Sequence, residues 1–207
     1  MQHALQHLEL FEGFNEDITS PVVIITSQPS VWVGIPRSGP PHYSINGTEW
    51  HTATAPHTRS RLHLTAVTCG EGLFVAAGNQ ILTSSDGFKW ESQFQFPHNE
   101  SGVVAFADQR WVCVGHHGRK MGSIDKGITW MTQPDRFPGH YRAIAAGNGT
   151  FVAVGPTLNG EGLINTSSDG ISWTGEQTGG TPFISIHFGN GRFIAMDTRG
   201  GIHTSKN

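Results

Sequence analysis

The sequence predicts an all-β fold, a five-bladed β-propeller built from four-stranded antiparallel blades. Three observations support this prediction: a repeat of about 40 residues, a Trp that ends the same kind of turn in four repeats, and a composition rich in turn residues. Of the 207 residues, 27 are Gly and 11 are Pro, while charged residues make up 14%. That mixture suits short strands joined by tight turns. Four-stranded repeats of this length are typical of propellers.

The most regular strand of each repeat is a short apolar run that contains small residues. It occurs five times, at residues 30–34, 74–78, 111–115, 151–155 and 193–197. Another apolar strand precedes each copy, at residues 22–25, 65–69, 103–107, 143–146 and 184–188. A single blade cannot bury both of its faces, so successive blades must pack on one another around a ring. We place the repeats at residues 21–60, 61–100, 101–140, 141–181 and 182–207.

The two ends of the chain differ from the repeat. The last copy stops at Asn207, before any strand that bears a Trp, and residues 1–20 precede the first copy. We predict that residues 1–20 complete the last blade as a closing strand, through the alternating run at 8–12. The alternative is a docking helix with Leu5, Leu8 and Phe11 on one side.

A turn with a Trp follows the third predicted strand in four repeats. Its Asp or Asn and its Trp are Asn46 with Trp50, Asp86 with Trp90, Asp125 with Trp130, and Asp169 with Trp173. The four Trp residues stand 40, 40 and 43 positions apart. Asp-Gly and Asn-Gly favour tight hairpins, because Gly adopts a positive φ and the Asp or Asn side chain can accept hydrogen bonds from the turn. These eight residues are therefore predicted to be structural.

The turns resemble the Asp-box, S-x-D-x-G-x-x-W, of sialidase-like propellers. Residues 123–130 match this pattern, and the other three copies are one residue shorter. In that family the Asp-box is a fold-stabilising turn remote from catalysis, so the resemblance implies a fold and no activity. The shorter variant is also similar to propeller repeats of phage virion proteins and bacterial surface proteins.

Sialidase chemistry would need residues that this sequence does not place in the channel. It requires three arginines around a carboxylate, an acid/base residue and a Tyr-Glu nucleophile. The two tyrosines, Tyr43 and Tyr141, fall in predicted loops. The predicted inner strands contain almost no carboxylates, so the paired acids of glycoside hydrolysis are not expected there. We expect no enzymatic activity.

Histidine is abundant, with 12 residues, but its spacing does not predict a metal site. His57, His98 and His140 each follow a Pro in a connection between blades, where equivalent positions lie far apart. His116 and His117 are adjacent, which is a poor arrangement for chelation without other ligands. We expect no metal ion and no cofactor.

Charge and hydropathy limit the possible partners. The net charge is −3, and the 13 Lys and Arg residues are scattered, which argues against nucleic acid. No segment has the length for membrane insertion, and the N-terminus lacks the basic region and apolar run of a secretory signal. The sequence thus predicts synthesis in the cytoplasm without a signal peptide. Cys69 and Cys113 are expected to be free and buried.

The predicted binding surface is the face that holds the connections between blades and between second and third strands. These loops differ most from blade to blade. Their aromatic and basic residues are Arg37, Tyr43, His98, His116, His117, Arg119, Phe137, His140 and Tyr141. Such residues on loops of a rigid scaffold are typical of recognition sites. An asymmetric face favours one protein contact over five equal sugar sites.

We therefore expect a non-enzymatic, rigid interaction module. The resemblance suggests a structural component of a phage virion, such as a tail, baseplate or capsid appendage, that contacts other virion proteins or the host surface. The alternative is a lectin that binds cell-surface glycans through the loop face. A glycosidase is a third possibility, which the missing carboxylates disfavour.

Overall fold

A computed structural model of the chain describes residues 23–28, 31–36, 38–56, 61–97, 100–132 and 139–205. These residues form five antiparallel β-sheets and one short 3-10 turn, η1 (His116–Gly118). The predicted all-β class is confirmed. In this part of the chain, no helix is long and apolar enough to cross a membrane.

The strands of each sheet pair with one another in chain order. The first sheet contains β1 (Val23–Gln28), β2 (Val31–Ile35), β3 (His42–Ser44) and β4 (His51–Thr52). The second contains β5 (Leu64–Gly70), β6 (Leu73–Gly78), β7 (Gln80–Ser84) and β8 (Glu91–Gln95). The third contains β9 (Gly102–Ala107), β10 (Arg110–Gly115), β11 (Lys120–Ser123) and β12 (Met131–Thr132).

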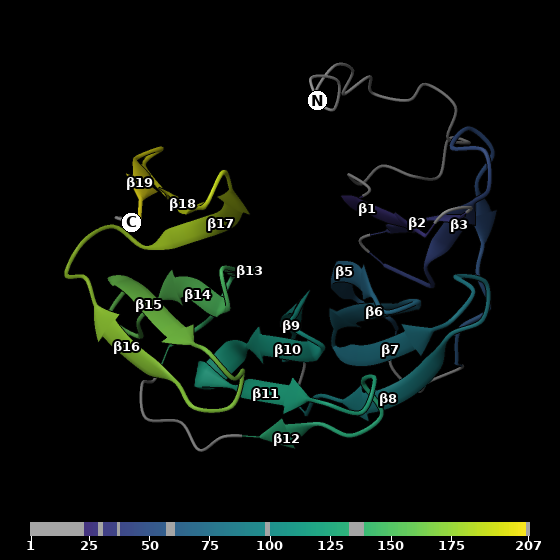
Figure 1. Cartoon of the computed structure of the whole chain (residues 1–207), viewed down its shortest axis with the longest axis horizontal. Coiled ribbons are helices and arrows are strands. Elements are labelled where there is room, and N and C mark those ends of the chain that lie inside the picture. The colour runs from purple at the N-terminus through teal and green to yellow at the C-terminus, as the bar shows by residue number, and fades with distance from the viewer. Residues whose placement is uncertain are drawn as a thin grey trace.

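The fourth sheet contains β13 (Ala143–Gly147), β14 (Thr150–Pro156), β15 (Gly162–Ser167) and β16 (Thr174–Gln177). The fifth has three strands, β17 (Phe183–Gly189), β18 (Arg192–Asp197) and β19 (Ile202–Thr204). The sheets follow one another around an arc, with the first strand of each on the concave side (Figure 1). The first and last sheets stand apart at the two ends of this arc. Residues 1–20, predicted to complete the last sheet, lie outside the described residues.

Among the described residues the core consists of four apolar clusters, one between each pair of consecutive sheets. We call the side of a sheet that contacts the following sheet its forward face, and the other side its backward face. Val112 and Val114 on the forward face of β10 share a cluster with Phe151 and Ala153 on the backward face of β14. Side chains alternate along a strand, so each second strand supplies both faces. This explains why its apolar run is the most regular part of the repeat.

The turns that carry Asp or Asn share one hydrogen-bonding pattern. In the fourth sheet, Asp169 Oδ1 accepts hydrogen bonds from the backbone N–H of Ile171 (2.8 Å) and Ser172 (2.6 Å). The Ser167 hydroxyl donates to the same oxygen (3.0 Å) and accepts from the N–H of Gly170 (2.8 Å). Asn46, Asp86 and Asp125 make the corresponding bonds in their own turns. The turn is thus held by its own side chains.

The indole N–H of three Trp residues closes these turns. Trp90, Trp130 and Trp173 donate to the carbonyl oxygen of the turn glycine at 3.0, 2.9 and 3.3 Å. Each Trp therefore packs beside the turn that precedes it and fixes the start of the fourth strand.

Both cysteines are free. Cys113 is buried in the cluster between the second and third sheets, and this burial raises the pKa of its thiol. Cys69 is only partly buried.

Candidate functional site

Two loops meet at the same end of the strands in the third and fourth sheets. One is η1 between β10 and β11, and the other is residues 139–142, which lead into β13. The N–H of Gly118 donates to the carbonyl of Gly139 at 2.6 Å, and the N–H of Tyr141 donates to the carbonyl of Gly115 at 3.1 Å. A connection between blades and a connection between second and third strands thus lie together, as the sequence predicts.

This junction gathers three histidines. The ring centroids of His116 and His117 lie 5.3 and 5.2 Å from that of His140, and 6.4 Å from each other. The backbone N–H of His117 also donates to His140 Nδ1 at 3.3 Å. Desolvation lowers the pKa of His140, and the neighbouring charges of His116, His117 and Arg142 lower it further. In the described parts of the chain, no group of three His, Cys, Asp or Glu side chains is placed to hold a metal ion.

Two basic residues beside the histidines are engaged within the protein. Arg119 forms an ion pair with Glu100 at 2.9 Å, and its guanidinium lies 5.9 Å from the ring centroid of Phe96. The Lys120 ammonium donates to the carbonyl of Gly118 at 2.9 Å and lies 3.3 Å from the Tyr141 hydroxyl. Both cations help to hold the loops in place.

Tyr141 differs from the surface aromatic that the sequence predicts. It is 3% exposed and packs in the cluster between the third and fourth sheets. The Lys120 ammonium lies 5.2 Å from its ring centroid, so the ring helps to satisfy a buried charge. Tyr141 thus supports the loops from below and does not present its ring to a ligand.

Tyr43 likewise lies outside this junction. It sits in β3, where the sequence places a loop, and its ring packs 5.4 Å from that of His51 and 4.4 Å from that of Phe88 in the second sheet. It therefore belongs to the boundary between the first and second sheets. Three other predicted binding residues, Arg37, His98 and Phe137, lie outside the described residues.

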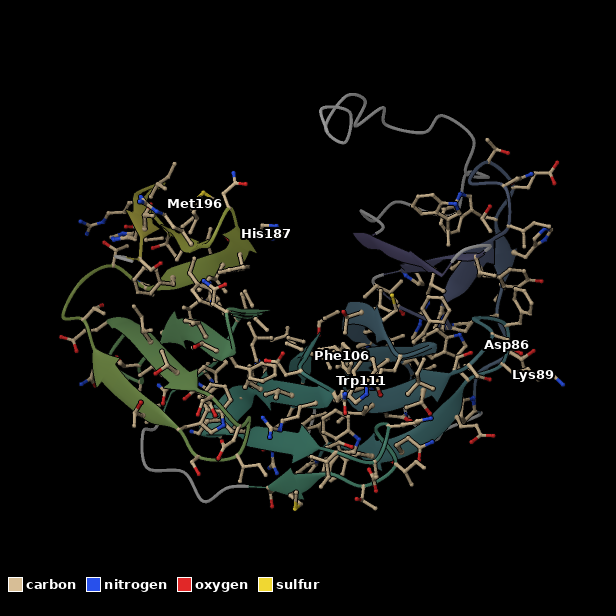
Figure 2. The ribbon with its side chains drawn as sticks, in the orientation of Figure 1. Asp86, Lys89, Phe106, Trp111, His187 and Met196 are labelled. Carbon is tan, nitrogen blue, oxygen red and sulfur yellow. The ribbon has the colours of Figure 1, made fainter. Side chains whose placement is uncertain are left out.

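The concave side of the arc holds a second candidate site that the sequence analysis did not single out. Residues of β5, β9, β13 and β17 line a hollow of about 380 Å³. The lining is mostly Ala, Val, Ile and Phe, with Thr68, Arg142 and His187 as polar members, and among the described residues it includes no carboxylate. Figure 2 shows Phe106 and His187 on this inner side. The hollow is thus an apolar surface with cationic and neutral polar groups.

Glycines at the ends of the inner strands allow two phenylalanines to pack across sheet boundaries. A Cβ on Gly70 would collide with the ring of Phe106 in the next sheet, and a Cβ on Gly147 would collide with the ring of Phe188. The rings thereby cover the glycine backbone and form part of the hollow's wall. The signal in the sequence was the unbroken apolar run of residues 103–107, which we used to define the repeat and to argue against catalysis, but not as a binding surface.

Arg142 connects the two candidate sites. It is exposed, follows the buried Tyr141, and lines the hollow. Its charge also contributes to the lowered pKa of His140 in the loop junction. Arg142 thus lies between the hollow, which strands of the second to fifth sheets line, and the histidine cluster of the third and fourth sheets.

Comparison with known proteins gives no family assignment. No family model matches the sequence, and no curated protein matches it. Solved structures do match: YCF48 bound to D1 peptide aligns with a TM-score of 0.69 and 16% identity, over 92% of this chain and 64% of that one. YCF48 from Cyanidioschyzon merolae aligns with a TM-score of 0.62 and 16% identity, over 91% of this chain and 68% of that one.

A designed protein, Ika8, aligns with a TM-score of 0.64 and 12% identity, over 86% of this chain and 56% of that one. The chain thus spans a little under two thirds of the length of YCF48 in the structure with D1 peptide. At such low identities the likeness concerns the fold alone. Together with the five antiparallel sheets, it shows that the chain has the β-propeller fold.

Proposed function

We propose that this chain is a non-enzymatic interaction module that holds an extended segment of a partner protein against its concave wall. The observation behind this proposal is the 380 Å³ hollow lined by four inner strands. Concave, mostly apolar surfaces with a few polar groups are the usual sites for binding. A strand-built wall that several blades share suits a segment several residues long.

The charges of the region favour a particular kind of segment. Arg142 borders the hollow, the three histidines lie beyond it, and the described lining residues include no acidic side chain that would repel a carboxylate. An apolar peptide that carries an Asp, a Glu or a free C-terminal carboxylate would place its apolar side chains on Val103 and Ile144 and its charge near Arg142. Electrostatic attraction of this kind speeds association and fixes orientation.

YCF48, a protein of similar fold, is bound to a D1 peptide in its structure, which supports peptide binding as the general class of activity. As the biological setting we propose a larger assembly, such as a phage virion, in which this chain contacts other structural proteins. We also propose that the five described sheets are the blades that this chain contributes to its propeller. The support is their regular succession around the arc.

Selection from a displayed library of random peptides on the immobilised full-length chain tests the proposal. Enriched peptides should combine apolar residues with a carboxylate, and Arg142→Glu should weaken their binding at least tenfold. Lys89→Glu is the matched control, because Lys89 is exposed on the outer side of the second sheet (Figure 2). Equal binding to Arg142→Glu and wild type would contradict the proposal. Glycan-array binding that free sugar abolishes would favour the lectin alternative.

A further inference from the structure

The last sheet exposes an apolar face. Ile194 and Met196 of β18 are 46% and 40% exposed, and Ile202 of β19 is 73% exposed. Figure 2 shows Met196 on the side of this sheet that points away from β13–β16. The opposite side is covered, since Phe183 and Ala195 share a cluster with Val152 and Val154 of the fourth sheet.

Strand register identifies the residues that correspond to this face in the other sheets. Val152 pairs with Thr166 in the fourth sheet as Ile194 pairs with Thr204 in the fifth. By the same register, Met196 corresponds to Val154. The forward-face residues of the third and fourth sheets, Val112, Val114, Val152 and Val154, are all buried against a following sheet. Ile194 and Met196 thus form a forward face built like the others, and no described sheet follows it.

Residues 1–22 have a composition that complements this face. They include Leu5, Leu8, Leu10, Phe11 and Phe14, together with Glu9, Glu12, Glu16 and Asp17, and they contain no Lys or Arg. Around the exposed face, Arg192 at the start of β18 and Arg199 in the turn after it are both exposed basic residues. An apolar, acidic segment therefore matches an apolar face with basic residues at its ends.

The segment is also long enough to reach the last sheet. It precedes β1 in the first sheet, at the opposite end of the arc (Figure 1). An extended chain of 22 residues spans up to about 70 Å. A compact chain of 207 residues has a radius of gyration of about 17 Å, so the opening of the arc lies within this reach.

We propose that residues 1–22 cross the opening of the arc and cover the forward face of the last sheet. Leu8 and Leu10, on one side of the extended segment, contact Ile194, Met196 and Ile202, while the acidic residues lie near Arg192 and Arg199. This contact is with a face of the sheet, whereas a fourth strand would pair with the edge of β19. The contact links the two ends of the propeller and does not depend on what the concave wall binds.

Methionine oxidation in the full-length chain tests the contact. Met196 and Met131 have similar exposed fractions, 40% and 44%, and trypsin releases them on separate peptides, at residues 193–199 and 127–136. At low protein concentration, dilute hydrogen peroxide should oxidise Met196 several-fold more slowly than Met131, because the covered thioether is less accessible. Leu8→Asp with Leu10→Asp should restore the oxidation rate of Met196 and leave that of Met131 unchanged.

A control variant, Gln2→Asp with Gln6→Asp, adds the same charge to the segment and keeps its apolar residues, so Met196 should stay protected. Equal oxidation of the two methionines in the wild type would overturn the proposal, as would protection that survives the Leu8 and Leu10 substitutions. If Met196 is protected only at protein concentrations at which the native mass doubles, a second copy of the chain covers the face. That result would reject the contact with residues 1–22. None of these measurements involves a peptide ligand, so the contact can fail while the binding proposal stands.

Discussion

Gly170 in the turn of the fourth sheet lies directly against Val112 in the third. Its φ is +71°, and a Cβ on Gly170 would lie 2.5 Å from Val112 Cγ2. Gly87 makes the corresponding approach to the first sheet, where its Cβ would lie 3.2 Å from Val33 Cγ2. The Asp-Gly turn thus has two roles: it reverses the chain, and it packs on the forward face of the preceding sheet.

We expect Gly170→Ala to lower the free energy of unfolding by about 2–3 kcal/mol. The substitution forces an L-residue into a positive φ and drives a methyl group into Val112. Gly160→Ala is the control, because Gly160 has a φ of +81° and its Cβ would meet nothing within 4 Å. Urea unfolding should therefore show a loss of only about 1 kcal/mol for the control. Equal losses in the two variants would show that contact with Val112 adds no strain.

The carboxylate of Asp169 should be replaceable by an amide but not by a methyl group. Asn46 makes the same hydrogen bonds in the first sheet, to the N–H groups of Thr48 and Glu49. We expect Asp169→Ala to cost about 1 kcal/mol, because two backbone donors lose their acceptor and water replaces it only in part. Asp169→Asn should cost clearly less. Thermal unfolding of the two variants side by side tests this order, and a reversed order would contradict it.

Acid should destabilise the protein through the same turn. Desolvation raises the pKa of Asp169, but the hydrogen bonds from Ile171, Ser172 and Ser167 outweigh it and hold the pKa at about 2. Because this folded value lies below the usual Asp value of 3.8, the carboxylate stabilises the fold fully above about pH 4, and this contribution disappears as the pH falls toward 2. Unfolding free energies measured from pH 5 to pH 2 should fall less steeply in Asp169→Asn. An unchanged slope would count against this account.

The histidine junction should make the fold sensitive to milder acid. The pKa of His140 is lowered by desolvation and by the charges of His116, His117 and Arg142. Outside the junction, in β3, burial also lowers the pKa of His42. A folded pKa below 6.5 means that the unfolded chain takes up protons first, so stability is full above about pH 6.5 and falls below it. His140→Gln should reduce the loss of stability between pH 7.5 and pH 5.5, as chemical denaturation at both pH values would show. If His140→Gln loses as much stability between pH 7.5 and pH 5.5 as the wild type does, His140 has no such role.

The repeat-level features of this fold could be predicted because their causes are local. Asp169 and Gly170 define a turn through hydrogen bonds within five residues, and Trp173 adds a contact to the same turn. The apolar runs around Val152 and Val112 follow from the need to pack on both neighbours. Short stretches of sequence determine such features, so the first two strands of each sheet and its Trp-bearing turn could be placed without a structure, whereas β3, with Tyr43, lies where the sequence predicts a loop.

The candidate site was harder to predict, since it depends on contacts between distant residues. Tyr141 looked like a surface aromatic, but Lys120, 21 positions earlier, needs its hydroxyl and ring inside the protein. Arg142, the next residue, remained exposed and was not selected. The open shape of the arc depends on how successive sheets pack on one another, which is set by many side-chain contacts and has no single residue as its signal.

The position of a sheet in the arc also determines how it unfolds. Sheets three and four are each held by clusters on both faces, whereas the fifth has three strands and shares one cluster, with the fourth. In a linear array that is stabilised by contacts between neighbours, the ends open first and the middle last. Amide hydrogens of β18 and β19 should therefore exchange sooner than those of β10 and β14. The fold then behaves as a stack that frays from its ends, and any contact that covers Ile194 and Met196 would slow the opening that starts at the fifth sheet.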